Sequence, residues 1–178
     1  MNLSPQGRAF LTDYEKARSK AYRDSAGKWT IGIGHLLTPR EIKSDLMVIG
    51  EASITWRTTT LTPALMDTLF VQDLAPRESA LNKLLTKEPT QQQFDAMLCL
   101  LYNIGQGSAK LWEPGGFTRS SVRRNFNKGN TQKTADAFLL WNKARNPDTG
   151  VLEVSPGLVK RRAQERAMFL DGNYNSEH

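Results

Sequence analysis

The stretch that decides the fold is residues 15–38, which read EKARSKAYRDSAGKWTIGIGHLLT. A carboxylate, Glu15, stands near the end of an expected helix, and a second carboxylate, Asp24, follows at a turn signal. Thr30 places a hydroxyl in the strand-like run after that turn. Two carboxylates in different environments, able to face each other across a sugar, are what cleavage of a glycosidic bond requires. Spacing alone also allows a plainer interpretation, in which Glu15 is a surface helix residue and Asp24 forms a turn.

The residues around this stretch predict a helix followed by a small sheet. Ser4 and Pro5 have the order of an N-cap and a first helical residue, and apolar side chains then recur at helical spacing. We expect this first helix to run to about Lys20. Strand-forming residues and glycines then dominate residues 21–34, with a turn signal at 25–28, which indicates a small sheet.

Capping patterns predict where the later helices begin. Thr38 opens a capping box for a short helix, and Thr62 starts a second helix that Pro76 should kink or break. Thr90 opens another capping box before a helix that is apolar nearly all round, which is typical of a buried central helix. The segment 41–60 remains open to turn, strand and short-helix interpretations.

The last third of the chain is expected to be mainly helical. The predicted helices run from a cap at Thr118 to about Lys128, from Thr131 to Lys143, and from Ser155 to a stop at Gly172, with a turn at 146–150. The whole pattern predicts an α+β fold that is predominantly helical and forms one domain. A cleft is expected where the sheet lobe meets the helical lobe.

Length and composition are those of an ordinary soluble protein. The 178 residues are 39% apolar, and the lone cysteine, Cys99, excludes an intrachain disulfide. The first ten residues lack the charged and apolar regions of a signal peptide, and no stretch approaches the roughly 18 apolar residues that span a membrane. We therefore expect that a target outside the cytoplasm would require delivery by another protein.

The charge of the chain is unevenly spread. The formal net charge is +6, and residues 119–166 hold eleven Lys or Arg and four Asp or Glu, a net of +7. A basic half attracts polyanions, which include nucleic acid, anionic lipid and bacterial cell wall. Charge alone does not choose among them, although the sequence has no recognisable motif for reading nucleic acid.

The two carboxylates and the hydroxyl suggest separate roles. Glu15, near a helix end and beside Tyr14, could be partly desolvated, which would raise its pKa and keep it protonated as a general acid. Asp24, in a polar turn, would stay ionised and act as a base on a water molecule. The hydroxyl of Thr30 could hold that water.

Four separated segments together resemble the phage T4-type lysozymes, the endolysins of glycoside hydrolase family 24. They are the arrangement Glu-x8-Asp-x5-Thr followed by IGIGH, and the later LTPALMDTLFVQDL, QQQFDAMLCLLYNIG and GLVKRRAQERAMF. The resemblance implies a sheet lobe at about 15–60 and a helical lobe at about 62–172 that includes the N-terminal helix. A long helix near 62–86 would join them. The segment 41–60 has little similarity to the family pattern.

The resemblance also implies a muramidase. Its substrate would be peptidoglycan, cut between N-acetylmuramic acid and N-acetylglucosamine, with Glu15 as the general acid. Asp24 and Thr30 would position and activate the attacking water. The family's inversion of anomeric configuration fits two carboxylates far enough apart to admit that water. No metal or cofactor would be needed.

Further residues fall where the family lines its sugar cleft, namely Leu36, Tyr102, Asn103 and Ser120. Arg161 falls where the family places a basic partner for its catalytic glutamate, here Glu15. Tyr102 is equally compatible with an ordinary core position. Arg161 is also compatible with a solvated basic face or with a helical ion pair to Glu165.

The two histidines do not suggest a metal site. His35 follows the glycines of the opening stretch, and His178 stands at the end of the chain. A histidine-based metal site would lack ligands. We expect His35 to have a structural role, hydrogen-bonded behind the site.

The biological setting follows from the resemblance. We expect a monomeric endolysin, made in the host cytoplasm and acting on the cell wall in the periplasm, with access through a holin-type pore. Neither stable membrane insertion nor nucleic-acid binding is expected. Alternatives are a lysozyme carried by a virion or bacteriocin, a cationic protein that kills by binding wall or membrane, and a nucleic-acid binder. The basic last helix, 155–172, could also disturb outer-membrane lipid.

Overall fold

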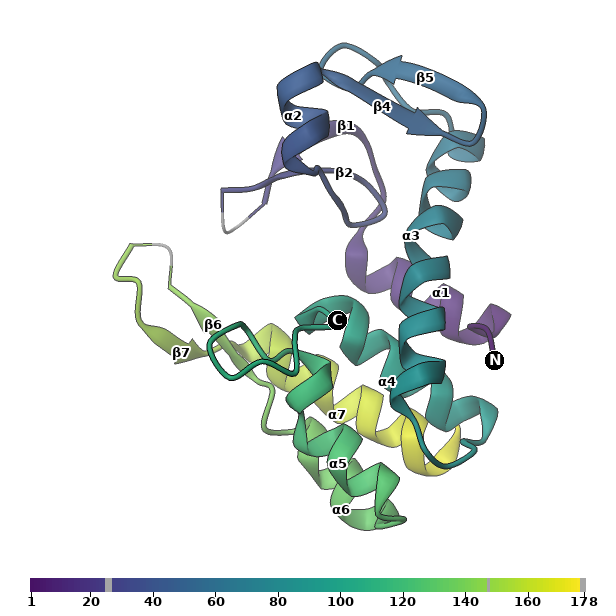
Figure 1. Cartoon of the computed structure of the whole chain (residues 1–178), viewed down its shortest axis with the longest axis vertical. Helices are drawn as coiled ribbons and strands as arrows, with labels where there is room; N and C mark the ends of the chain where they lie inside the picture. The colour runs from purple at the N-terminus through teal and green to yellow at the C-terminus, as the bar shows by residue number, and fades with distance from the viewer. Residues whose placement is uncertain (25–26, 147, 177–178) are drawn as a thin grey trace. The chain divides into compact units, whose positions relative to one another are not determined.

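The computed structural model of the chain describes residues 1–24, 27–146 and 148–176 (Figure 1). The chain divides into a sheet unit, Thr12–Pro76, and a helical unit, Met1–Leu11 with Arg77–His178. Two helices, α1 (Pro5–Glu15) and α3 (Pro63–Leu84), run from one unit into the other. The expected α+β, predominantly helical class is confirmed.

The first sheet begins earlier than the sequence suggested. Helix α1 is capped as expected, since the hydroxyl of Ser4 accepts a hydrogen bond from Gly7 N at 3.0 Å. It ends at Glu15, because Lys16 takes a left-handed backbone conformation (φ +50°). The predicted extension to Lys20 is wrong. Pairing between strands, which local propensity does not report, determines the structure of the residues after Lys16.

Three antiparallel strands follow α1 in the order β1-β2-β3. They are β1 (Arg18–Arg23), β2 (Trp29–Gly32) and β3 (His35–Leu36). The expected small sheet is therefore confirmed. Part of the turn predicted at 25–28 lies outside the described residues, because residues 25 and 26 are not among them.

The segment 41–60, which the sequence left open, lies in a short helix and a hairpin. Thr38 caps α2 (Pro39–Ser44) with the predicted capping box. Strands β4 (Leu46–Ile49) and β5 (Ala52–Thr55) then pair antiparallel. The alternating burial along β4 shows that one face of this hairpin is directed into the unit.

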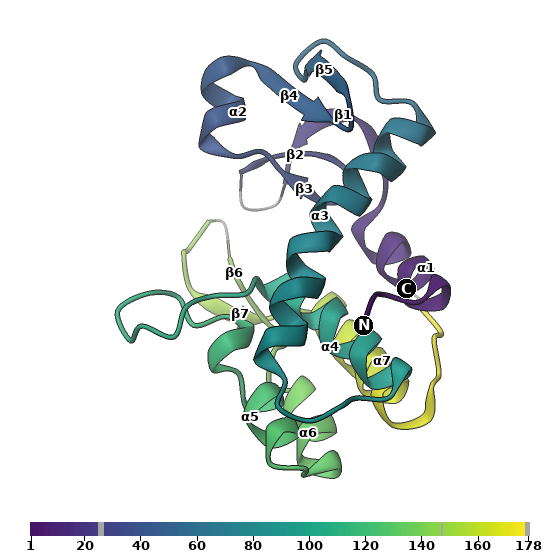
Figure 2. The same ribbon diagram turned by 45° about the vertical axis from the view of Figure 1, so that its right-hand side comes forward.

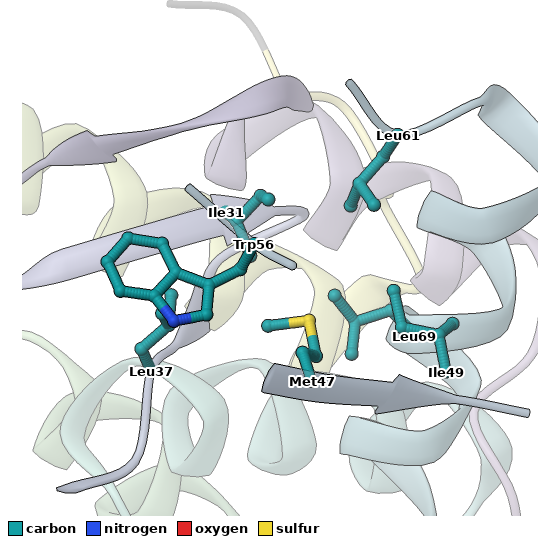
Figure 3. Packing of buried hydrophobic residues seen from close by; sticks show 7 residues of the cluster. All are labelled: Ile31, Leu37, Met47, Ile49, Trp56, Leu61 and Leu69. Carbon is teal, nitrogen blue, oxygen red and sulfur yellow. The ribbon is translucent and has the colours of Figure 1, made fainter. Parts of the chain in front are cut away.

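That inner face completes the core of the sheet unit (Figure 3). Its buried members are Ile31, Leu37, Met47, Ile49, Trp56, Leu61 and Leu69. Three of the seven come from the segment 41–60, which therefore supplies much of the packing behind strand β2. Trp56 is 1% exposed, and its indole N–H donates to the carbonyl of Glu41 at 2.9 Å, so its polar atom is also satisfied.

Helix α3 is the predicted long helix, and it continues through Pro76. The predicted break is therefore wrong. A proline removes one helical hydrogen bond and crowds one carbonyl, and the other bonds of a 22-residue helix remain available to hold it together. Whether the proline kinks the helix stays a prediction. The cap at Thr62 is confirmed, because its hydroxyl accepts from Leu65 N at 3.2 Å.

The helical unit is built around α4 (Gln91–Ile104), whose residues 94–102 are all buried. The capping box at Thr90 and the central position of this helix are as predicted. Helix α7 (Pro156–Asp171) packs along α4, and α6 (Thr131–Phe138) packs against both α7 and α5 (Ser121–Asn127) (Figures 1 and 2).

Two predicted boundaries in this unit are wrong, and one hairpin was missed. Ser120, not Thr118, caps α5, because Thr118 lies in a 3-10 turn, η1 (Phe117–Arg119). Helix α6 ends at Phe138, and the residues up to Lys143 lead into a hairpin instead. That hairpin pairs β6 (Lys143–Arg145) with β7 (Leu152–Val154). The predicted turn at 146–150 joins them, although residue 147 lies outside the described residues.

The ends of the helical unit are tied together by one buried carboxylate, Asp95. It accepts hydrogen bonds from Ser4 N at 3.1 Å, from the Ser4 hydroxyl, from Gln91 Nε2 at 2.8 Å and from the Tyr174 hydroxyl at 2.8 Å. Burial and the bond to Asp95 raise the pKa of Tyr174 to about 12, so the phenol remains a donor. The cap at Ser155 and the stop at Gly172 (φ +66°) are confirmed.

Candidate active site

Glu15 is held at the end of α1 against the turn between β2 and β3. A Cβ atom at Gly34 would lie 2.9 Å from Glu15 Oε2 and 3.4 Å from Glu15 Cβ, so the glutamate occupies the space that a side chain at residue 34 would need. Gly34 also has φ +73°, which L side chains rarely adopt. The second glycine of the sequence Gly-Ile-Gly thus allows the sheet and this carboxylate to lie close together.

Asp24 follows β1 and closes its own turn. Its carboxylate Oδ1 accepts a hydrogen bond from Lys28 N at 2.8 Å, and its backbone N–H donates to Lys28 O at 2.9 Å. Asp24 is partly exposed. The expected polar turn is therefore present at its described residues, and it fixes the direction of the carboxylate.

Thr30 lies in the middle of a row of three side chains across the sheet. It is directly opposite Tyr22 on β1 and Leu36 on β3. Thr30 is 5% exposed, and its hydroxyl makes a long hydrogen bond, 3.4 Å, to Lys28 O. Leu36 is 45% exposed, so a solvent-exposed apolar side chain lies beside the nearly buried Thr30.

Tyr22 connects the two carboxylates electrostatically. Burial raises the pKa of its hydroxyl, the charge of Arg18 opposes this, and the negative charges of Glu15 and Asp24 raise it further. Arg18 lies over the Tyr22 ring, with its guanidinium carbon 4.7 Å from the ring centroid. The phenol therefore stays protonated at neutral pH, where it can act as a hydrogen-bond donor within electrostatic range of both carboxylates.

His35 lies behind this row and is bound to the following helices. Its Nδ1 is 3.0 Å from each carboxylate oxygen of Asp73 on α3, and its Nε2 is 3.4 Å from Glu41 Oε2. The expected hydrogen-bonded role is confirmed. Burial would lower the pKa of His35, but the hydrogen bonds and charges of Asp73 and Glu41 outweigh burial and raise it.

The other residues expected at the sugar belong to the helical unit. Tyr102 is 8% exposed, and the guanidinium carbon of Arg77 lies 4.4 Å from its ring centroid. Asn103 is exposed, and its Oδ1 accepts from Arg162 Nη2 at 2.9 Å. Ser120 is 1% exposed, and its hydroxyl accepts from Arg123 N at the start of α5.

Arg161 forms part of a buried charge cluster on α7. Its Nε donates to Glu165 Oε1 at 3.1 Å, and Arg162 Nη1 lies 3.0 Å from Glu165 Oε2 as an ion pair without hydrogen-bond geometry. The ion pair with Glu165 is therefore confirmed. The solvated basic face is wrong for these two arginines, since both are buried, as is Glu165. Breaking such a pair would leave an uncompensated buried charge.

Sequence reasoning missed three residues of this arrangement. Tyr22 was treated only as a strand former, although its place two residues before Asp24 puts it opposite Thr30 once β1 and β2 pair. Gly34 is one of the glycines of the expected sheet, and nothing in the sequence connects it with Glu15. Asp73 carries no local signal, because it reaches His35 from 38 residues away in the chain.

The described residues contain no group of three or more His, Cys, Asp or Glu side chains placed to hold a metal ion. Within the same part of the chain, no helix is both long and apolar enough to cross a membrane.

The sequence model of the family described as phage lysozyme matches residues 12–165. The chain belongs to this family. It is 35% identical to the endolysin of Salmonella phage P22 over 96% of this chain and 99% of that protein. The fold is likewise that of solved members of the phage lysozyme family. The endolysin from Escherichia coli O157:H7 phage FAHEc1 superposes with a TM-score of 0.78 at 28% identity, covering 98% of this chain and 97% of that one.

A bacterial protein outside the phages shares the fold as well. The muramidase domain of SpmX from Asticaccaulis excentricus superposes with a TM-score of 0.73 at 29% identity. The match covers 95% of this chain and 97% of that domain.

The pairing of His35 with Asp73 predicts that stability depends on pH. Since the folded pKa of His35 is raised above its ordinary 6.5, the pair should stabilise the fold fully below pH 6.5 and lose this contribution as pH rises through the folded pKa. A difference of 1 between folded and unfolded pKa corresponds to about 1.4 kcal/mol. Urea unfolding of the wild type and Asp73→Asn should therefore differ most at mildly acidic pH. A difference that stays constant into the alkaline range would contradict this.

Proposed function

We propose that the chain is a phage lysozyme that cleaves peptidoglycan between N-acetylmuramic acid and N-acetylglucosamine, and that it serves as an endolysin in host lysis. Membership of the phage lysozyme family over residues 12–165 supports the glycoside hydrolase activity. The observation that carries the proposal for the site is the packing of Glu15 against Gly34, in the same unit as Asp24 and Thr30.

Glu15 is the proposed general acid. Its side chain is half-buried at the end of α1, and its position is restricted by the β2–β3 turn. A carboxylic acid held in one place can protonate the leaving oxygen of a glycosidic bond without first searching for its orientation.

Asp24 and Thr30 are the proposed partners of the attacking water. The Asp24 carboxylate is oriented by the N–H of Lys28, and a carboxylate held in this way can accept a hydrogen bond from a water molecule. The Thr30 hydroxyl, whose bond to Lys28 O is long at 3.4 Å, can rotate toward the same water. We propose further that the Tyr22 hydroxyl donates a hydrogen bond at this place, acting as a positioning residue.

Inversion of the anomeric configuration is the proposed stereochemical outcome. It follows from the assignment of Asp24 as a base on water rather than as a nucleophile. No metal or cofactor takes part in the proposed reaction.

The proposed contacts with sugar divide into two groups. Leu36 in the sheet unit is the more direct candidate, because it is exposed beside Thr30. Tyr102, Asn103 and Ser120 remain proposals, and the engagement of the Ser120 hydroxyl in a helix cap favours a positioning role for that residue. Arg161 remains the proposed basic partner of Glu15, although Glu165 already pairs with it.

The proposed setting is lysis of an infected bacterium. A monomer made in the cytoplasm would reach peptidoglycan through a holin-type pore. We expect that cells expressing the chain without such a pore do not lyse. They should lyse when a pore is supplied. Lysis at full rate without a pore would contradict this route.

Replacing Glu15 by Gln tests the catalytic assignment. The amide keeps the size of the side chain but cannot donate an acidic proton, so activity on isolated Gram-negative peptidoglycan should fall by roughly 100-fold to 10,000-fold. Mass spectrometry of the wild-type digest should show fragments with reducing N-acetylmuramic acid ends. Anhydromuramic ends would instead identify a lytic transglycosylase, and the roles of Asp24 and Thr30 would be wrong. No fragments from the wild type would leave a wall-binding protein.

Replacing Gly34 by Ala tests whether the packing of Glu15 matters. The new Cβ would displace the glutamate, and a displacement near 1 Å can cost about 100-fold in rate. Gly150→Ala is the matched control, because Gly150 has a similar φ of +70° but an added Cβ there would meet nothing within 4 Å. Both variants should lose about 1–2 kcal/mol of stability from the left-handed backbone. Equal activity of the two would contradict the proposed constraint.

Replacing Tyr22 by Phe removes the proposed donor and keeps the ring under Arg18. We expect kcat to fall by about tenfold with little change in KM, because a hydrogen bond to a charged group is lost. Tyr174→Phe, in the helical unit, should leave kcat unchanged and is the control. A kcat of Tyr22→Phe equal to that of the wild type would exclude the positioning role.

A further inference from the structure

The hairpin formed by β6 and β7 has an exposed face of mixed chemistry. Lys143 is directly opposite Val154, and Arg145 is directly opposite Leu152. Opposite residues, and residues two apart on one strand, share a face of a hairpin, so these four side chains lie together. All four are exposed. One face therefore presents two cations interleaved with two aliphatic side chains.

Within the described part of the chain, the two cations of this face are not paired with an acidic side chain, although the hairpin also carries the carboxylates of Asp148 and Glu153, and Glu153 accepts a hydrogen bond from Asn146. Among the residues that the structure describes, neither Lys143 nor Arg145 forms an ion pair, and the Arg145 guanidinium donates to the carbonyl of Gly150. Leu152 and Val154 are each 57% exposed. Two exposed aliphatic residues on one face beside two cations offer contacts of both kinds to a partner.

A second exposed apolar pair stands at the tip of the loop 105–116. Leu111 is 83% exposed and Trp112 is 81% exposed. In both views the loop lies beside the β6–β7 hairpin (Figures 1 and 2). The tip also carries Lys110, whose Nζ lies 5.9 Å from the centroid of the Trp112 ring.

Hydrogen bonds to the loop and within it fix its conformation, and this conformation leaves the tip exposed to solvent. Arg119 donates to the carbonyls of Leu111 and Glu113, and Ser108 N donates to Pro114 O at 2.8 Å. At the neck, a Cβ on Gly107 would lie 2.1 Å from the backbone of Gly115. The exposure of the two apolar side chains is therefore built into the loop.

The chemistry of this surface fits a bilayer better than a glycan. Trp, Leu and Val beside Lys and Arg are the combination that places apolar groups at a membrane interface and cations among anionic headgroups. Recognition of sugar hydroxyls would need several polar side chains around the aromatic ring. At the tip, Lys110 lies near the Trp112 ring and pairs with Glu113 at 3.3 Å.

The last helix offers fewer free cations than its sequence suggests. Arg161 and Arg162 are buried and pair with Glu165, so these two cations of the segment 155–172 are unavailable to lipid. Lys160 and Val159 remain exposed, and an effect of this helix on outer-membrane lipid stays a prediction.

We propose that the helical unit binds the surface of an anionic phospholipid bilayer through the β6–β7 face and the Leu111–Trp112 tip. The proposal is independent of the proposed catalytic residues. It predicts binding without insertion of a helix, with an affinity that falls as salt screens the headgroup charge.

Cosedimentation of the full-length protein with vesicles tests this. Vesicles of phosphatidylglycerol mixed with phosphatidylethanolamine should sediment the wild type, and vesicles of phosphatidylcholine alone should not. Trp112→Ser and the double variant Lys143→Gln with Arg145→Gln should each weaken binding by about tenfold, because each removes interfacial or charged contacts. Fluorescence of the wild type should shift to the blue on binding.

Two valines provide a matched comparison. Val154 on β7 and Val48 on β4 are both exposed strand residues, 57% and 60%. Val154→Ser should weaken vesicle binding, and Val48→Ser should not, while both retain wild-type activity on purified peptidoglycan. Equal effects of the two, or no binding by the wild type, would overturn the proposal. Loss of cosedimentation with purified sacculi by Trp112→Ser, with vesicle binding unchanged, would overturn it in favour of a wall-binding surface.

Discussion

The packing of Glu15 against Gly34 is the constraint on which the candidate site depends. The glutamate reaches this place because α1 stops at a left-handed Lys16, and the turn accepts it because residue 34 has no side chain. The same turn sets the register of β2 and β3, which puts Leu36 opposite Thr30. The absence of a side chain at residue 34 therefore links the end of α1, the pairing of β2 with β3 and the position of the Glu15 carboxylate.

The strand that carries Thr30 faces two environments. Thr30 lies in the row with Tyr22 and Leu36, whereas the next residue, Ile31, is fully buried in the core of the sheet unit. Since side chains alternate along a strand, a slip of one residue would exchange the two. The hairpin β4–β5 opposes such a slip, because its Met47 and Ile49 pack in the same core as Ile31. The segment 41–60 thus helps to hold the register of strand β2.

Local signals in the sequence predicted the caps at Thr38, Thr90 and Ser155, because a cap depends on residues three positions apart. They failed at Lys20 and Lys143, where strand pairing replaced the expected helix. The spacing of Glu15, Asp24 and Thr30 was readable within the opening stretch. Contacts such as His35 with Asp73 were not, since the fold, rather than a sequence pattern, brings them together. Catalytic roles for the three residues stay predictions.

Net charge predicted the binding surface of the protein poorly, because it counts buried and exposed cations alike. Residues 119–166 have an excess of positive charge, and two of the cations in this segment, Arg161 and Arg162, pair with Glu165 inside the helical unit. Because this pairing is buried, it acts within the helical unit and does not attract a polyanion. Arg119 is likewise engaged in bracing the loop 105–116. The cations that remain able to meet an anionic partner include Lys143 and Arg145, on a hairpin that propensity did not reveal. Which cations are exposed on this chain therefore depends on which arginines are buried in the core. The fold determines that, and the sequence alone does not show it.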